Sequence, residues 1–163
     1  MSRKNIAKTV VVLLVVFGAL GTAVAQMPNP YGPAISLENA KKAAASALAE
    51  AAKNSWRVAV AIVGPAGTLI YYEKMDNTQL GSAEVAVDKA RTAALFKRPT
   101  KAFQDVLAGG GDGLRVLTLK GVVAVEGGIP LVMDGKIVGA IGVSGATSAQ
   151  DAQCAKAGGD TVK

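Results

Sequence analysis

The chain has 163 residues, which is enough for one domain, and half of its residues are hydrophobic while 4% are aromatic. Its formal net charge is +6, but three of its basic residues and no acidic ones lie among the first 25 positions, so the rest of the chain carries +3. This excess is scattered and forms no block of Lys and Arg, which argues against nucleic-acid binding. The sequence has no histidine, which excludes the common nucleophile triads and the HExxH zinc site.

The N-terminus has the three parts of a secretory signal peptide. Basic residues precede an apolar run over 9–21, and Ala23-Val24-Ala25 forms a small-residue cleavage pattern. The apolar run is shorter than the ~20 residues that span a bilayer, which argues against a membrane anchor. We predict a signal peptide at 1–25 and a periplasmic or secreted protein without stable membrane insertion.

The first part of the mature chain predicts an arm, a helix and a hairpin. Residues 26–35 contain three prolines and are predicted to be an extended arm. Alanines then recur at helical spacing, which predicts a helix over 37–54 with Ser36 as its cap. Two β-type runs, 56–63 and 68–74, flank a Gly-Pro-Ala-Gly turn and predict a hairpin.

A second alanine-rich helix is predicted over 82–97, with Ser82 as its cap. Glu84, Asp88 and Arg91 share one stripe of this helix, a pattern typical of a solvated face with one weak ion pair. After Pro99, Thr100 can cap a short helix through Leu107. Residues 109–113 are mostly glycine and form a connection that lacks the Lys-Ser or Lys-Thr of a phosphate-binding loop.

The stretch 121–145 is apolar and rich in glycine, and its Asp134-Gly135 pair predicts a two-residue hairpin turn. We also predict a strand over 118–125 that leads into it. Thr147 or Ser148 can cap a last helix that runs through residue 157. The elements together predict an α+β domain over 36–163, with a sheet of about five mostly antiparallel strands and flanking helices.

The other side chains that could take part in chemistry are one cysteine and several carboxylates. Cys154 is the only cysteine, and we predict that it is buried on the last helix; an intermolecular disulfide or a metal ligand are the alternatives. The carboxylates make no recognised ligand spacing, so the pattern favours a binding module over a hydrolase and we assign no catalytic residue. The acidic residues considered are Asp76, Glu84, Asp88, Glu126 and Asp151.

Several motifs follow one another in a fixed order along nearly the whole mature chain. They are Val58 to Val63 with Gly67, Met75-Asp76, Gly81-Ser82, Lys89 to Ala93, Phe96 to Thr100, Glu126 to Leu131, Asp134-Gly135, Gly139 to Gly145 and Gln150-Asp151. Over about residues 36–160 they resemble the GlcG/HbpS-like haem-binding family. The resemblance implies a profilin-like fold with a five-stranded antiparallel sheet, relatedness to the C-terminal domain of some corrinoid adenosyltransferases, a homo-oligomer, and binding or sensing of haem or another tetrapyrrole.

The resemblance also indicates where a ligand would be held. The predicted ligand-binding residues are Met75, Asp76, Lys89, Arg91, Phe96, Arg98, Thr100, Glu126, Gly127 and Gly128. Phe96 and Phe103 can pack on a porphyrin, and the three cations in this set can pair with its propionates.

The iron ligand stays open, because some relatives use histidine and this chain has none. Met, Tyr and Cys ligate haem in other folds. The candidates here are Met75, Met133, Tyr31, Tyr71, Tyr72, Cys154, Thr100 or a lysine.

Two other functions are compatible with the sequence. The chain can be an enzyme or binder that acts on a small carboxylic acid, with Arg91 as the carboxylate anchor and Asp76 or Glu126 as the base. It can also be an oligomeric structural or interaction protein without turnover, in which the alanine-rich helix faces are subunit contacts.

Overall fold

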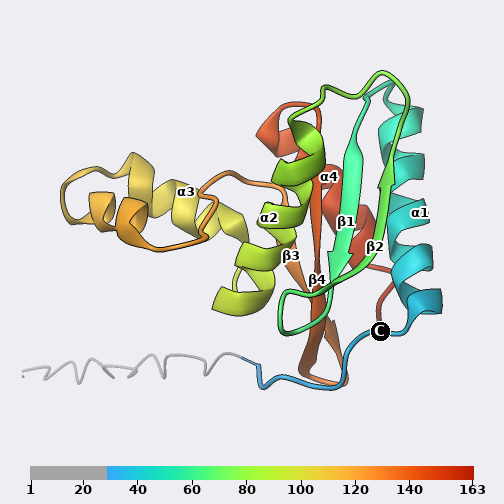
Figure 1. Cartoon of the computed structure of the whole chain (residues 1–163), viewed down its shortest axis with the longest axis horizontal. Helices are drawn as coiled ribbons and strands as arrows, with labels where there is room; N and C mark the ends of the chain where they lie inside the picture. Colours follow the sequence, from blue (N-terminus) through green and yellow to red (C-terminus); the bar gives the residue numbers. More distant parts are fainter. Residues whose placement is uncertain (1–28) are drawn as a thin grey trace, which may run out of the picture.

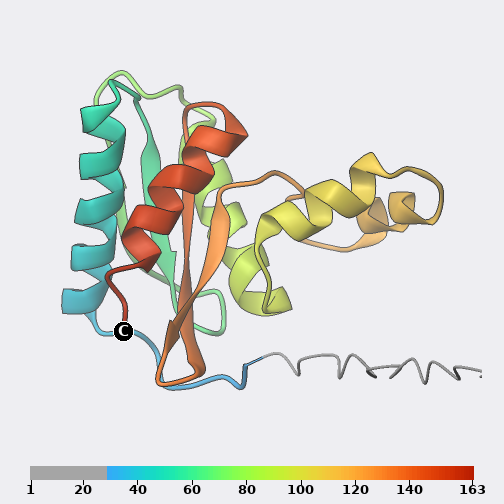
Figure 2. The same cartoon turned by 180° about the vertical axis from the view of Figure 1, so that it is seen from behind.

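A computed structural model of the protein describes residues 29–163, so the predicted signal peptide lies outside the described residues. A four-stranded antiparallel sheet in the order β2-β1-β4-β3 lies between two helices on one face and one helix on the other (Figures 1 and 2). The elements are α1 (Leu37–Lys53), β1 (Ala59–Val63), β2 (Leu69–Lys74), α2 (Ser82–Phe96), α3 (Thr100–Ala108), the 3-10 helix η1 (Gly111–Thr118), β3 (Gly128–Met133), β4 (Lys136–Ser144) and α4 (Ser148–Gly159). The predicted α+β class is confirmed.

The two central strands, β1 and β4, give the sheet two different faces. Ala59 pairs with Ser144 and Val63 with Ala140, and all five β1 residues are buried. Because side chains alternate along a strand, Val60 and Ile62 face α1 and α4, while Ala59 and Ala61 face α2. The face toward α2 is therefore built from small side chains.

Helix α2 lies unusually close to β4, and glycine makes this possible. A Cβ added to Gly142 would lie 2.1 Å from the carbonyl oxygen of Ala86 and 2.5 Å from the amide nitrogen of Ala90. The central glycines thus allow the chain's own helix to approach.

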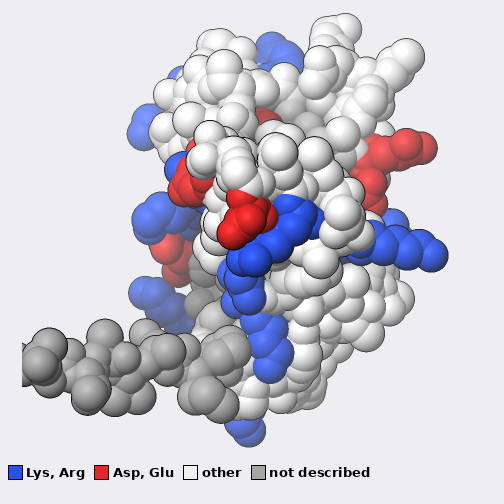
Figure 3. All heavy atoms as spheres, turned by 90° about the vertical axis from the view of Figure 1, so that its left-hand side faces the viewer, with Lys and Arg blue, Asp and Glu red and all other residues white. Residues whose placement is uncertain are grey.

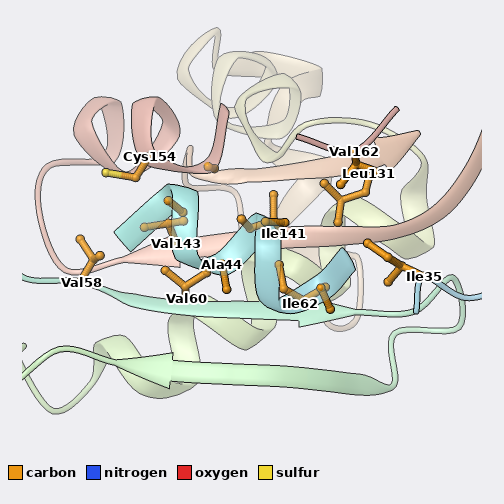
Figure 4. Close-up of a cluster of buried hydrophobic side chains, with 14 of the residues drawn as sticks. Ile35, Ala44, Val58, Val60, Ile62, Leu131, Ile141, Val143, Cys154 and Val162 are labelled. Carbon is orange, nitrogen blue, oxygen red and sulfur yellow. The ribbon is translucent and has the colours of Figure 1, made fainter. Parts of the chain in front are cut away.

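The larger core lies on the other face of the sheet, under α1 and α4 (Figure 4). Val60, Ile62 and Ile141 of the strands meet the alanine face of α1, which includes Ala44, and the side chain of Cys154 from α4. Full burial of a Val or Ile side chain contributes about 1.5–3 kcal/mol. The predicted burial of Cys154 is confirmed, because its exposed fraction is 0%.

The hairpin turn is as predicted, and the structure describes residues 29–35 of the predicted arm. Asp134 and Gly135 have φ values of 49° and 72°, the left-handed pair that a two-residue hairpin requires. The Ile137 amide donates to the Pro30 carbonyl at 2.8 Å, and the Gly32 amide donates to the Ile137 carbonyl at 2.9 Å. The described part of the arm is therefore extended and lies along the first residues of β4.

The predicted five-stranded sheet is wrong, because the sheet has four strands among the described residues. The predicted strand over 118–125 is instead the end of η1 and a loop. The loop runs past α2, where the Val123 amide donates to the Thr92 hydroxyl at 2.9 Å. A side chain thus satisfies a backbone group that the prediction assigned to a strand ladder.

Two predicted caps are also wrong. The N-cap of α2 is Gly81, and the Ser82 hydroxyl lies 3.2 Å from the Ser144 hydroxyl. The N-cap of α3 is Pro99, and the Thr100 hydroxyl accepts a hydrogen bond from the Gly128 amide at 2.9 Å. In both places the hydroxyl is hydrogen-bonded to a residue distant in sequence and does not cap the helix.

The caps of the outer helices are as predicted. Ser36 accepts a hydrogen bond from the Asn39 amide, and Thr147 forms a capping box with Gln150. Helix α4 ends at Gly159, slightly beyond the predicted residue 157. Among the described residues, none of the helices has the length and hydropathy needed to span a membrane.

Candidate functional site

The predicted ligand-binding residues lie in four different places, and one of these is a buried ion pair. Lys89 Nζ lies 2.8 Å from Asp151 Oδ2, and both side chains are at most 3% exposed. Lys89 Nζ also donates to the Val143 carbonyl at 3.0 Å, while Asp151 Oδ1 accepts from the Ala146 amide at 3.0 Å. Lys89 thus connects α2 to β4 and α4, and its charge faces the interior.

Burial raises the pKa of Asp151, and the hydrogen bond from Lys89, its positive charge and the backbone N–H groups of Ala146 and Gly145 oppose that shift. The raised pKa means that burial of the carboxyl has a larger effect on it than the hydrogen bonds and the Lys89 charge together. Sequence reasoning assigned Lys89 to a ligand and left Asp151 among isolated acids. The one signal for the pair was Gln150-Asp151 among the ordered motifs, but no rule of spacing connects residues 62 positions apart.

Gly127 and Gly128 lie directly against this ion pair. Gly127 has φ +125°, and an added Cβ would lie 2.8 Å from Lys89 Nζ. An added Cβ on Gly128 would lie 2.4 Å from the Lys89 carbonyl oxygen, and the Gly128 amide is bonded to the buried Thr100 hydroxyl. These two glycines and Thr100 join the start of β3 to α2 and α3.

A second place is the junction of α2 and α3, where a helical arm made of α3 and η1 projects from the body of the molecule (Figures 1 and 2). Phe96 and Phe103 meet edge to face, with ring centroids 5.4 Å apart. The Arg98 guanidinium lies 5.5 Å from the centroid of the Phe103 ring, and Arg98 Nε donates to the Phe96 carbonyl at 3.1 Å. We call this group of Phe96, Arg98 and Phe103 the arm-base cluster.

The arm-base cluster is accessible on one side. Phe103 is 5% exposed, whereas Phe96 is half-buried and Arg98 is exposed. Glu126 lies nearby, since its amide donates to the Gln104 side chain of α3 at 2.8 Å. Acidic and basic side chains are interspersed over this side of the molecule, and much of its surface is uncharged (Figure 3). The cluster therefore offers an aromatic edge next to an exposed guanidinium.

A third place is a groove of about 480 Å³ between β2 and α2, lined by Leu69, Tyr72, Val87 and Arg91 among others. Arg91 Nη1 lies 3.5 Å from Asp88 Oδ1, and Arg91 Nε donates to the Gly67 carbonyl at 3.3 Å. The weak ion pair predicted for this helix stripe is confirmed. The Tyr72 hydroxyl is buried and has no hydrogen-bond partner among residues 29–163, and burial raises its pKa.

The fourth place is the end of β2. Met75 packs against the core on the α1 side of the sheet, and Asp76 is exposed in the turn that follows. Arg91 lies on the other side of the sheet beside two acidic residues, Glu84 and Asp88. Neither proposed base, Asp76 or Glu126, is among the residues that line the groove with Arg91.

The donor set fits a tetrapyrrole in part. An exposed guanidinium beside aromatic rings suits a propionate and the edge of a porphyrin. The hydroxyls of Tyr31, Tyr71 and Thr100 are hydrogen-bonded within the chain, and burial raises the pKa of the Cys154 thiol to about 11, which keeps it neutral. Within residues 29–163, no group of three or more His, Cys, Asp and Glu side chains is placed to hold a metal ion. The described side chains are thus better suited to contact the porphyrin ring and its propionates than to ligate its iron.

Comparison with known sequences gives a consistent family. Residues 35–160 match the family model described as "Haem degrading protein HbpS-like". Protein GlcG of Escherichia coli K12 is 41% identical over 110 residues, which cover 68% of this chain and 81% of GlcG. A corrinoid adenosyltransferase, PduO of Salmonella typhimurium, is 36% identical over 101 residues, and the match covers 30% of that longer protein.

Solved structures agree. The crystal structure of HbpS is 32% identical, with a TM-score of 0.74, and covers 81% of this chain and 92% of its own. The crystal structure of a PduOC:haem complex is 30% identical, with a TM-score of 0.72, and covers 80% of this chain and 96% of its own. An HbpS double mutant from Streptomyces reticuli is 28% identical, with a TM-score of 0.75, and covers 98% of this chain and 99% of its own.

Proposed function

The chain belongs to the HbpS-like family, and on that premise we propose that it binds haem or a related tetrapyrrole. The observation that carries the proposal is the similarity, over 80% of the chain, to PduOC, which was solved as a complex with haem. The family model spans all of the residues predicted to contact the ligand. The proposal concerns binding, and it assigns no catalytic residue.

We place the ligand at the arm-base cluster. Arg98 has its Nε bonded to the Phe96 carbonyl, so the guanidinium is held in one orientation. Within the described part of the chain its two terminal nitrogens have no hydrogen-bond partner, which leaves them to a carboxylate. Charge-assisted hydrogen bonds of this kind contribute about 1.5–3 kcal/mol. Phe96 adds an apolar edge, and its contact with Phe103 fixes the position of its ring. Bound haem would supply the iron chemistry, while these side chains bind and orient its periphery.

Lys89 and Arg91 contribute less directly to this proposal. The Lys89 ammonium is buried against Asp151, so its effect on the ligand is to hold Gly127 and the start of β3 in place. Arg91 is on the groove between β2 and α2, next to Asp88. Arg98 is therefore the cation for which the geometry best supports a propionate contact.

The experiment compares two arginine variants in a haemin titration followed by the Soret band. We expect Arg98→Ala to raise the dissociation constant by about tenfold or more, because one bidentate pair is lost. Arg115 is a matched control, since it is also exposed and lies in η1, on the helical arm that begins beside Arg98. If Arg98→Ala and Arg115→Ala weaken binding equally, the arm-base cluster is not the site; if the native protein gives no saturable change, haem binding itself is rejected.

We further propose that the protein is exported and matures by cleavage before Gln26. The support is the charged start, short apolar run and small-residue exit of the first 25 residues. N-terminal sequencing of protein recovered from the periplasm or medium tests this. A mature chain that begins at Gln26 supports it, and an intact N-terminus found only in the cell interior contradicts it.

A further inference from the structure

The side chains that ligate haem iron in other proteins are those of His, Cys, Met and Tyr. This chain has no histidine anywhere in its sequence. Its other candidates within residues 29–163 are one cysteine, two methionines and three tyrosines: Cys154, Met75, Met133, Tyr31, Tyr71 and Tyr72. The positions of these side chains relative to the arm-base cluster decide whether a haem bound there would meet a protein ligand for its iron.

The three sulfur atoms belong to the larger core. Cys154 is part of this core, and Met75 and Met133 pack against it. The core lies on the face of the sheet under α1 and α4 (Figure 4), whereas α2, which leads into the arm-base cluster, packs on the opposite face. A cysteine ligates a metal as the thiolate, and burial raises the pKa of the Cys154 thiol to about 11. The sulfur donors are therefore placed for packing.

Two of the three tyrosines are on β2. The Tyr71 hydroxyl donates to Glu73 Oε2 at 2.6 Å, and this hydrogen bond raises the pKa of Tyr71. Tyr72 lines the groove between β2 and α2, and its hydroxyl oxygen is buried. Neither hydroxyl is presented to a ligand at the arm-base cluster.

Tyr31 is the candidate that contacts α2 next to Phe96. Its hydroxyl lies 2.9 Å from the Ala94 carbonyl oxygen and 3.1 Å from the Leu95 carbonyl oxygen, in the last turn of the helix. Tyrosine ligates iron as a phenolate, which has no proton to donate. A phenolate here would face two carbonyl oxygens at the negative end of the helix dipole. The position suits a hydroxyl donor and opposes a phenolate ligand.

The lysines beside the cluster are engaged through their positive charge. Lys97 Nζ lies 4.2 Å from the centroid of the Tyr31 ring, an attraction that requires the charge. Lys101 forms an ion pair with Asp105, and the hydrogen bond between them raises the pKa of Lys101. An ammonium nitrogen has no lone pair to give to iron. None of these candidate donors within residues 29–163 is thus both close to the cluster and placed to ligate.

The contacts that the arm-base cluster does offer do not involve a metal. The Arg98 guanidinium is exposed and can form a bidentate pair with a carboxylate. The Phe96 ring is half-buried beside it and offers an apolar edge to a macrocycle. Haem and a metal-free porphyrin carry the same propionates on the same apolar ring. Both contacts are therefore available to either ligand.

We infer that the arm-base cluster selects a porphyrin by its propionates and its ring, without a protein ligand to the metal, and so binds metal-free porphyrins as tightly as haem. The inference rests on the proposed function, because it concerns which tetrapyrroles the same site accepts. The ligand class is a flat, apolar macrocycle with carboxylates at one edge. The iron of a bound haem adds no affinity.

The first measurement compares three ligands in titrations followed by the Soret band. The ligands are haemin, protoporphyrin, which keeps the propionates and lacks the metal, and protoporphyrin dimethyl ester, which also lacks the free carboxylates. We expect haemin and protoporphyrin to have dissociation constants within about threefold of each other. The dimethyl ester should bind at least about tenfold more weakly than protoporphyrin, because it cannot form the charge-assisted pair with Arg98.

The variant Arg98→Ala tests that pair. It should weaken the binding of haemin and protoporphyrin by the same factor, about tenfold, and leave the binding of the dimethyl ester unchanged. Arg115→Ala is the control and should change none of the three dissociation constants. Circular dichroism establishes that each variant is folded.

A second measurement removes candidate iron ligands one at a time. Tyr31→Phe, Met75→Leu and Met133→Leu should each leave the Soret maximum of the haemin complex unchanged, because none of these side chains contacts the iron. Met27 lies outside the described residues, so Met27→Leu is tested in the same way. Exchange of Met for Leu nearly conserves volume, so the fold should be retained.

Three outcomes would overturn the inference and leave haem binding itself standing. Haemin can bind at least about tenfold more tightly than protoporphyrin, which would assign the difference to the iron. One of the four variants can shift the Soret maximum of the haemin complex, which would identify its side chain as a ligand. Arg98→Ala can weaken the dimethyl ester as much as protoporphyrin, which would exclude recognition of the propionates. If neither haemin nor protoporphyrin binds, the proposed function fails together with the inference.

Discussion

Lys89 shows how a single residue can be misassigned when only its sequence neighbours are known. The sequence predicted that it contacts a ligand together with Arg91, yet its ammonium is 2.8 Å from Asp151 in the protein interior. A buried charge that loses its partner is destabilising by about 3–5 kcal/mol. The pair therefore makes a specific prediction about stability.

We predict that Lys89→Met lowers the free energy of unfolding by about 3–5 kcal/mol, because it leaves the Asp151 carboxylate buried and unpaired. Asp151→Asn should also destabilise, and the double variant should lose less than the sum of the two. Urea unfolding of the four proteins gives this double-mutant cycle. Simple additivity would mean that the two side chains do not act as a pair.

The same carboxyl gives a pH dependence. Because burial raises the pKa of Asp151 above its ordinary value of 3.8, the native state holds this proton more tightly than the unfolded state. Its contribution to stability is fully present below pH 3.8 and is lost as pH rises through the folded-state pKa. In Lys89→Met the pKa should rise further, so we expect the destabilisation to shrink as pH falls. A penalty that does not change between about pH 4 and pH 7 would contradict this.

Cys154 provides a second pH test at the alkaline end. Its thiol is fully buried, and its pKa is raised from 9.0 to about 11, chiefly by burial. Between those values the unfolded chain loses the proton and the native chain keeps it, so stability falls as pH rises. We expect the stability of the native protein relative to Cys154→Ala to fall by at most about 2–3 kcal/mol from pH 9 to 11. If the stability difference between the native protein and Cys154→Ala does not change over this pH range, burial does not keep the thiol protonated.

At the scale of elements, the packing of α2 on β4 depends on one glycine. A Cβ on Gly142 would lie 2.1 Å from the carbonyl oxygen of Ala86, a backbone atom of α2. Overpacking typically costs about 1–3 kcal/mol. Because a 2.1 Å approach to a backbone atom is more severe than an added methylene in a core, Gly142→Ala should destabilise by at least ~3 kcal/mol or prevent folding. Gly81→Ala is the control, since no atom of the described residues lies within 4 Å of its added Cβ. Equal thermal stability of the two variants would contradict the close approach.

The sequence predicted elements well where local rules decide and less well where distant contacts decide. Alanine spacing and Ser36 located α1, and Asp134-Gly135 located the β3–β4 turn, because both signals act within a few residues. The segment 118–125 has β-type residues, yet its amide at Val123 bonds to Thr92 of α2. Local propensity does not report such a partner. The same reason explains why Ser82 and Thr100 do not act as caps.

At the scale of the whole molecule, the candidate site was predicted only in part. The sequence motifs identified Phe96 and Arg98, which the structure brings together with Phe103. The motifs also included Lys89, Gly127 and Gly128, which lie together around the buried ion pair, and Arg91, which lies on the groove. A motif shared by a family can contain residues needed for packing as well as residues that bind a ligand, and sequence spacing does not distinguish the two kinds. The contacts of each side chain in the structure distinguish them.

The absorption spectrum of the purified protein during a haemin titration tests the central claim most directly. We predict a saturable change of the Soret band that is distinct from the spectrum of free haemin and that reaches its end point at a fixed ratio of haem to chain. A spectrum that equals the sum of free haemin and protein at every point of the titration would contradict the claim.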